Sequence, residues 1–414
     1  MGGAQIIDSG NTAWMLVSTA LVLMMLLPGL ALFYGGLVRA KNLLSVMSQT
    51  LGIAAIAILV WIGWGYSLAF GVGNSVVGGL SKLGLAGVDG ATAWATPSAG
   101  KAIPELAFVA FQMTFAAITA ALIIGALAER VRFGAIMLFT LLWLTIVYAP
   151  LAHMVWAPEG LLSAFGAIDF AGGTVVHVNS GIAGLVGVYF AGPRMGHLKE
   201  AMPPHSLALT MVGVGLLWVG WFGFNAGSAL EANGLAAVAM INTFAAPAAG
   251  ILAWMGIERV VSGKPSMLGG ASGAVAGLVA VTPAAGIGGP IGAMLLGALS
   301  SVACYGFVGS LKNRLRLDDS LDVFGIHGIG GIIGSLGTAV VALPLIGGHG
   351  AADYSLGWQL LRQLAAVGTA IAWSAVGSAA CFAVVRMVLP MRHDGYGERE
   401  GLDISDHGER AYNY

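Results

Sequence analysis

The chain has 414 residues, of which 57% are hydrophobic and only 9% are charged, and its formal net charge is −1. A soluble domain carries about 25% charged residues, and a nucleic-acid partner requires a basic surface. This composition therefore excludes a soluble domain and a nucleic-acid-binding protein. The two cysteines, Cys304 and Cys381, stand in apolar runs and predict no disulfide framework. The sequence therefore predicts an all-α polytopic membrane protein.

Apolar runs long enough to cross a membrane recur along the chain. About 20 residues span roughly 30 Å of hydrocarbon. Eleven such runs are predicted, at 12–35, 45–71, 104–128, 133–153, 172–192, 205–227, 236–258, 267–283, 288–310, 322–344 and 358–388. Of the 18 Lys and Arg residues, 15 lie on one side: 14 in every second connection or in the tail, 389–414, and Arg386 at the end of the final run. The positive-inside rule then places the N-terminus outside and the C-terminus in the cytoplasm. No basic segment precedes the first run, so no cleaved signal peptide is expected.

The fifth and tenth runs each carry a histidine in an apolar, glycine-rich sequence. These are His177 in "GGTVVHVNSGIAG" and His327 in "VFGIHGIGGIIG". Glycines follow each ring by 4, 7 and 10 residues, and an acidic residue precedes each ring, Asp169 by eight positions and Asp322 by five. Because five is odd, runs one to five and six to ten would be copies of opposite orientation, as in many transporters. We therefore predict a transmembrane domain, 1–388, with repeats at 12–192 and 205–344 and a final helix at 358–388.

The spacing places both rings in the middle of the membrane. At 1.5 Å per residue, His177 lies about 12 Å into a helix entered from outside, and His327 about 8 Å into one entered from inside. Each ring could instead be a packing residue bonded to a neighbouring helix, but intramembrane ionisable groups mark function by default. A neutral pair offers donors and acceptors to a small neutral molecule. No third ligand suggests a metal, and Asp169 and Asp322 suit N-capping.

Aromatic residues gather at the outer ends of three runs. Trp156 ends the fourth run, and "GWFGFNAGSA" ends the sixth. Aromatic faces stabilise a desolvated cation by about 2 kcal/mol, and a hydroxyl accepts one N–H hydrogen bond. An interfacial aromatic belt is the alternative. The candidate residues of this outer site are Phe111, Gln112, Phe115, Trp156, Trp221, Phe224 and Ser228.

Five segments resemble the ammonium transporters of the Amt/Mep/Rh superfamily, on the bacterial Amt side. They are "DFAGGTVVHVN", "GWFGFNAGSA", "GKPSMLGGASGAVAGLV", "DVFGIHG" and "EGLDISDHGERAYNY". The resemblance implies a homotrimer in the cytoplasmic membrane, each protomer with its own pore. The chain departs from the family at Ala120, often proline, and at Pro158 and Glu159, in a loop that is usually glycine-rich. Those departures leave helix bend and vestibule shape open.

The resemblance also implies a role for each candidate. His177 and His327 correspond to twin pore histidines, and Asp169 to an essential aspartate, to which we add Asp322. The phenyl gate corresponds to Phe115 and Phe224, and the outer substrate site to Trp156 and Ser228, with Phe111 and Gln112 beside them.

The expected activity is transport of ammonium and methylammonium. Ammonium is captured outside, deprotonated near the gate, passed along the histidines as ammonia and reprotonated inside. Whether the proton also crosses stays open. An ammonium sensor is the alternative, although only 26 residues follow the last run. No nucleophile–base set predicts an enzyme, and no cofactor is expected. The polar tail alone predicts a disordered terminus, whereas the resemblance implies that it packs on the cytoplasmic loops and helps a PII-type signalling protein to dock.

Overall fold

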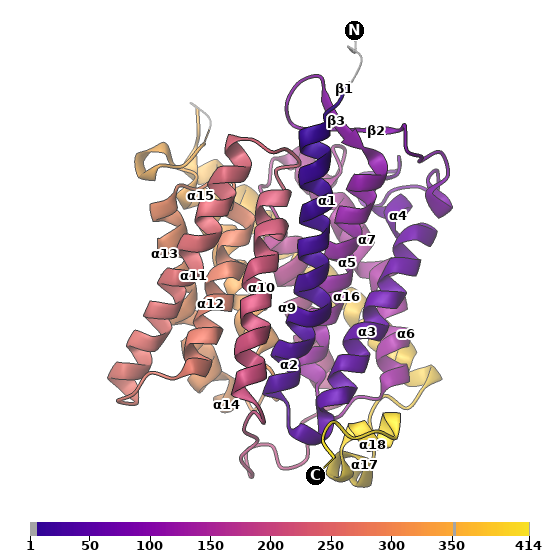
Figure 1. The fold of residues 1–414 in the computed structure, drawn as a ribbon, viewed down its shortest axis with the longest axis vertical. Helices are drawn as coiled ribbons and strands as arrows, with labels where there is room; N and C mark the ends of the chain where they lie inside the picture. The colour runs from indigo at the N-terminus through magenta and orange to yellow at the C-terminus, as the bar shows by residue number, and fades with distance from the viewer. Residues whose placement is uncertain (1–5, 351–352, 414) are drawn as a thin grey trace.

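The chain folds into a bundle of long helices that run between two ends of the molecule (Figure 1). The computed structural model describes residues 6–350 and 353–413. Within them, eleven helices are long and apolar enough to cross a membrane, which confirms the predicted number. Helices suit this setting because hydrocarbon cannot bond the backbone N–H and C=O groups. The two marked termini lie at opposite ends of the bundle, as an odd number of spans requires. Which end faces the cytoplasm stays a prediction.

Four of the first five spans contain two or more segments, and the third is the single helix α5. They are α1 (Ser9–Met24), η1 (Met25–Leu30) and α2 (Ala31–Leu37); η2 (Ala40–Asn42), α3 (Leu43–Val60), η3 (Trp61–Gly65) and α4 (Tyr66–Phe70); α5 (Glu105–Leu127); α6 (Phe133–Trp143), η5 (Leu144–Tyr148) and α7 (Ala149–Trp156), followed by α8 (Leu161–Phe165); and η6 (Gly173–Val178) with α9 (Asn179–Ala191).

Of the remaining six spans, three are single helices and three contain two or more segments. They are α10 (Leu207–Gly227); α11 (Gly234–Val261); α12 (Met267–Val281) with η7 (Thr282–Ala284); α13 (Pro290–Gly306), η8 (Phe307–Leu311) and α14 (Lys312–Arg314); η9 (Phe324–Gly328) with α15 (Ile329–Val341); and α16 (Leu356–Val388). Two short 3₁₀ turns, η4 (Leu83–Leu85) and η10 (Pro344–Ile346), lie in connections.

The two halves of the chain pack their helices in the same pattern. In the first half α3 contacts α5 and α6, and in the second half α11 contacts α12 and α13. The first span of one half, α1, also lies against the first span of the other, α10. This pattern supports the predicted inverted repeat, whose boundaries stay a prediction.

The fifth and tenth spans touch at glycines that follow the two histidines. A Cβ added to Gly181 would lie 2.4 Å from Gly328, and one added to Gly331 would lie 3.0 Å from the backbone N of Val178. Each glycine stands four residues after its own histidine and packs on the residue after the other histidine. A side chain at Gly181 would force the two helices apart, whereas one at Gly331 would require its neighbours to shift by a few tenths of an ångström.

A small sheet covers the end of the bundle near the N-terminus. Its strands are β1 (Ile6–Ile7), β2 (Ala93–Ala95) and β3 (Lys101–Pro104), in the order β1-β3-β2. β3 pairs with β1 in parallel and with β2 antiparallel, with Trp94 opposite Ile103. The sequence analysis did not predict this sheet. It fixes the connection between the second and third spans, and with it Trp94.

The tail forms two short helices at the opposite end, α17 (Gly395–Glu400) and α18 (Leu402–His407) (Figure 1). Asp403 accepts a hydrogen bond from Ser45 N at 2.8 Å, and Leu402 N donates to Asn42 Oδ1 at 2.9 Å. Leu402 is 1% exposed. The disorder predicted from tail composition alone is therefore wrong, and the packing on the loops that the resemblance implied is observed.

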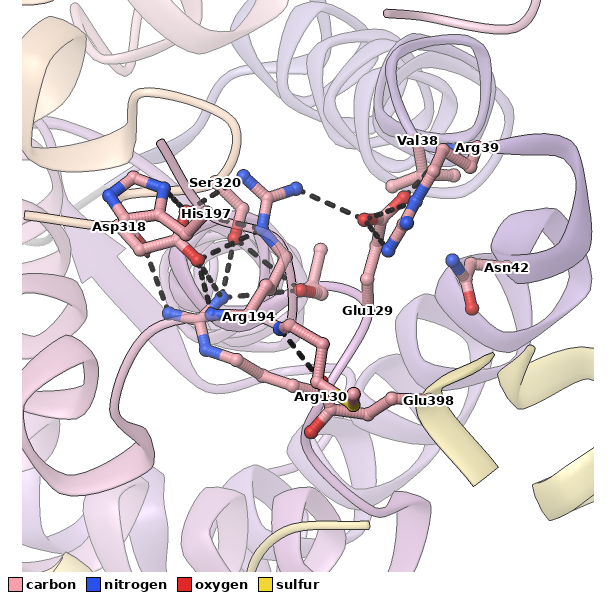
Figure 2. A network of polar contacts seen from close by, with 12 residues as sticks. Val38, Arg39, Asn42, Glu129, Arg130, Arg194, His197, Asp318, Ser320 and Glu398 are labelled. Carbon is pink, nitrogen blue, oxygen red and sulfur yellow. Dashed lines mark hydrogen bonds and ion pairs between the residues drawn. The ribbon is translucent and has the colours of Figure 1, made fainter. Parts of the chain in front are cut away.

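A network of buried ion pairs joins the loops at the tail end (Figure 2). Glu129 accepts from Arg39 Nε at 2.9 Å and from Arg194 Nη1 at 3.1 Å, and Arg194 Nη2 also donates to Asp318 at 2.7 Å. Burial by itself raises the pKa of both carboxyls, but the adjacent arginines outweigh burial and lower each pKa below its ordinary value. The network thus stays ionised at neutral pH.

Candidate functional site

His177 and His327 face each other at the crossing of the fifth and tenth spans. Their Nδ1 atoms are 3.2 Å apart and their ring centroids 5.3 Å. His177 is fully buried and His327 is 5% exposed. One Nδ1 must donate and the other accept, so each ring turns its Nε2 away from the pair. Among the described residues none bonds the buried Nε2 of His177. Both predicted histidines are therefore brought together.

Each histidine lies on a π-helical segment, His177 on η6 and His327 on η9. Such turns hold one residue more than an α-helical turn and occur often at functional sites. Here the widened turn comes in the same place relative to both rings, which agrees with a repeated unit. Nothing in the sequence analysis predicted it.

The side chain of Asp169 caps the start of the helix that carries His177. Its carboxylate accepts backbone N–H bonds from residues 172 to 175, at 2.5 to 3.2 Å, and the hydroxyl of Thr174. A single carboxylate thus satisfies the free N–H groups at the positive end of the helix. The backbone O of Asp169 also accepts from Trp156 Nε1 at 2.9 Å. Asp169 therefore orients Trp156 as well.

The N-capping role assigned to Asp322 is wrong, because Asp319 caps the tenth span. Asp319 accepts from the backbone N of Val323 and Phe324, both at 2.9 Å. Asp322 adopts a left-handed conformation with φ 60° and pairs with Lys312. Its side chain therefore turns away from the helix start. Asp319 precedes His327 by eight residues, as Asp169 precedes His177. This equal spacing in the sequence could have identified Asp319 as the cap.

A stacked phenyl pair lies on one side of the histidines. Phe115 and Phe224 are parallel within 11°, with centroids 4.1 Å apart. Phe224 lies 6.1 Å from His177, and Phe115 lies 5.9 Å from Trp156 in an edge arrangement. The pair thus stands between Trp156 and His177.

A recess of about 160 Å³ opens beyond the phenyl pair. It contains the predicted Gln112, Phe115, Trp156 and Ser228, whereas Phe111 does not line it and packs on Phe115 with centroids 4.9 Å apart. Five lining residues were not predicted: Phe70, Trp94, Phe108, Phe170 and Leu230. Trp94 comes from a loop strand, where no periodic pattern marks a site.

A second recess, of about 370 Å³, lies on the far side of the histidines. His327 lines it together with Tyr34, Glu258 and Asp322. The phenol of Tyr34 donates to Leu122 O at 3.0 Å. Carboxylates border this recess but not the smaller one, so the two recesses differ in charge.

Trp221 lies beside the histidine pair. Its ring stacks on His177 at 5.5 Å and 22°, and its Nε1 donates to Thr282 Oγ1 at 2.9 Å. The sequence analysis placed Trp221 with the outer aromatics, whereas the structure places it deeper. In residues 6–350 and 353–413 no three His, Cys, Asp or Glu side chains gather as a metal site would require.

Comparison with known proteins agrees with this geometry. The model of the Ammonium Transporter Family matches residues 13–412. An ammonium transporter of Aquifex aeolicus is 46% identical over 413 residues, covering 98% of this chain and 94% of that protein. One of Bacillus subtilis is 44% identical over 408 residues, covering 97% and 98%.

Solved structures show the same fold. The crystal structure of Saccharomyces cerevisiae Mep2 superposes with a TM-score of 0.84 at 36% identity, covering 94% of this chain and 88% of that one. A structure named Sensor Amt Protein has a TM-score of 0.87 at 26% identity, covering 96% and 98%. The chain therefore belongs to the ammonium transporter family, whose members are multi-pass plasma-membrane proteins and not enzymes.

Proposed function

We propose that this ammonium transporter captures the cation in the recess of Trp156 and Ser228 and conducts ammonia past His177 and His327. The observation that carries the proposal is one uninterrupted line of predicted residues. It runs from the aromatic recess through the stacked Phe115 and Phe224 to the histidine pair and then to the second recess.

Capture rests on the chemistry of the smaller recess. Aromatic faces attract a cation by about 2 kcal/mol or more once it sheds water, and Trp156 is held edge-on to Phe115. Ser228 Oγ donates to Phe224 O at 2.8 Å, which leaves its lone pairs to accept an N–H. Among the residues that the structure describes, no carboxylate lines the recess, so the bound ion is not trapped.

Conduction depends on the buried segment between the two recesses, which the phenyl pair and the two histidines fill. A charged ammonium ion loses its hydration there without a counter-ion, at a cost of several kcal/mol, whereas neutral ammonia does not. The ion therefore gives up its proton to water in the smaller recess before the phenyl pair, and ammonia exchanges hydrogen bonds with the histidine nitrogens. In the second recess, bordered by Glu258 and Asp322, water returns and ammonia is reprotonated.

The assembly, the orientation in the membrane and the partner of this protein belong to the same proposal. The protomer assembles as a homotrimer, and the tail end of the bundle faces the cytoplasm. Basic side chains gather at that end, among them Arg39 and Arg194 of the network (Figure 2). A PII-type signalling protein docks there on the tail and loops.

The experiment is flux and current measured together in proteoliposomes. Trp156→Leu combined with Ser228→Leu removes the capture site and is expected to weaken saturation, so that uptake rises more nearly in proportion to ammonium. Concentration dependence equal to that of the parent would return these residues to an interfacial belt. Ammonium-induced current in the parent decides whether the proton also crosses.

A further inference from the structure

A lysine side chain occupies a cation site next to the capture recess. Lys82 Nζ forms an ion pair with Glu105, and it lies 5.5 Å from the ring centre of Tyr66 and 5.7 Å from that of Trp94. Tyr66 OH donates to Glu105 Oε1 at 2.6 Å. The terminal ammonium of lysine thus has a carboxylate and two aromatic faces around it.

The same chemistry would hold a free ammonium ion. An ammonium ion and a lysine terminus present the same N–H donors and the same charge, and both are attracted by a carboxylate and by ring faces. The Glu105 side chain is 7% exposed, so its charge needs a partner. Lys82 is 25% exposed and reaches the site from the loop between the second and third spans.

The site shares a wall with the capture recess. Trp94 stacks on Phe108 with centroids 4.0 Å apart and planes within 8°, and both rings line the recess. Lys82 Nζ also lies over the Trp94 ring. The indole of Trp94 therefore contributes both to the lysine site and to the capture recess. The connection is fixed at Lys82 by its backbone N, which donates to Ser67 Oγ at 2.9 Å.

We propose that Glu105, Tyr66 and Trp94 form a second ammonium site, which Lys82 occupies as a tethered competitor. The inference rests on the proposed function for the identity of the cargo. The tether gives the lysine an effective concentration of about millimolar or more, so dilute ammonium does not displace it. The site takes a cation from outside only when ammonium is abundant.

The test is equilibrium binding of radiolabelled methylammonium to the purified, detergent-solubilised protein. Lys82→Met removes the competitor and is expected to bind one more methylammonium per protomer than the parent at low concentration. In the parent the additional ion is expected only at concentrations about 10-fold higher or more. Lys82→Met with Glu105→Gln should bind no additional ion, because the carboxylate is gone.

Lys101→Met is the matched control. Lys101 lies in the same connection as Lys82, between the second and third spans. It pairs with Asp8 at 2.5 Å, but its side chain is 48% exposed. This variant loses the same charge and should bind as the parent does. An additional ion in Lys101→Met as well would attribute the effect to surface charge and overturn the proposal.

A stability measurement covers the case in which Lys82→Met folds poorly. A ligand that binds the folded state raises the unfolding temperature. Ammonium chloride should therefore raise that temperature more than sodium chloride does in Lys82→Met, and not in the double variant. Equal effects of both salts, with no additional methylammonium, would make Lys82 a structural tether only. A parent that binds no methylammonium at all would instead contradict the proposed function.

Discussion

Substituting the two histidines tests most directly whether they form the path of ammonia. Replacing both rings with Ala removes the donor–acceptor pair between the two Nδ1 atoms, 3.2 Å apart, and leaves a void next to the second recess, from which water can enter. We expect His177→Ala with His327→Ala either to lose ammonium flux or to admit potassium. His327→Glu, which keeps a polar partner, should retain more flux than His327→Ala. Ammonium and potassium uptake in proteoliposomes measures both, and parental rate and selectivity in the double variant would reduce the rings to packing.

The two capping aspartates form a matched pair at the same scale. Asp169 and Asp319 cap equivalent helices, but only Asp169 also bonds Trp156. An amide has one acceptor oxygen, so Asn at either position leaves N–H groups of the first turn unpaired, at about 1–3 kcal/mol each. We expect both Asn variants to lose stability, and Asp169→Asn to lose methylammonium uptake as well, because it removes a negative charge next to Trp156, whereas the bond from Trp156 Nε1 to the backbone O of residue 169 remains. Equal uptake in the two variants at equal assembly would limit Asp169 to capping.

Asp319 also predicts a pH effect. Burial, and then the charge of Asp322, raises the pKa of Asp319 to about 6, although Lys312 opposes them. An unfolded aspartyl has a pKa of about 3.9, so the folded state holds the proton more tightly. This carboxyl therefore favours folding below about pH 4, and the benefit is lost as pH rises to about 6. Unfolding temperatures measured from pH 4 to 7 should depend less on pH in Asp319→Asn than in the parent. Parallel profiles would contradict the assignment.

At the scale of elements, the ion-pair network holds loops of both halves together. Arg130 is 0% exposed, donates to Asp318 O at 2.8 Å, and lies 3.9 Å from the Asp318 carboxylate. Removing one partner of a buried pair costs about 3–5 kcal/mol, so Asp318→Asn should strongly lower the unfolding temperature. Asp322→Asn, whose parental side chain is 27% exposed, should cost about 1 kcal/mol or less. Similar losses in both variants would show that burial does not decide the effect.

The sequence predicted the spans better than the features that interrupt or join them. Apolar length is a local property, so all eleven spans could be counted before their packing was known. The π-helical turns under the histidines depend on contacts between helices, and no local pattern marks them. Trp94 reaches its recess only because β2 pairs with β3. The cap of the tenth span was missed because the nearest acidic residue, Asp322, was taken in place of Asp319, whose spacing repeats that of Asp169.

At the scale of the whole molecule, the tail links the first half of the bundle to the connection between the halves. Glu398 in α17 pairs with Arg392 and accepts from Met195 N at 3.2 Å in the connection between the halves. In α18, Asp403 and Leu402 bond the start of the second span. The tail thus connects a loop of the first half with the segment that leads into the second. Its packing supports the prediction that it influences transport.

Two truncations separate α18 from the residues beyond it. Deletion from Gly401 onward removes α18 and exposes Asn42 and the backbone N of Ser45, which α18 covers. We expect lower ammonium flux and no capture of a PII-type protein, because the proposed docking surface and the packing of α18 on the start of the second span are both lost. Deletion from Glu409 onward keeps α18 and should retain most of the flux. Proteoliposome uptake and pull-down with a purified PII-type protein measure the two effects. Full flux and unchanged capture after the longer deletion would leave the tail as a structural cover alone, whereas equal loss after the shorter one would move the docking surface to the last six residues.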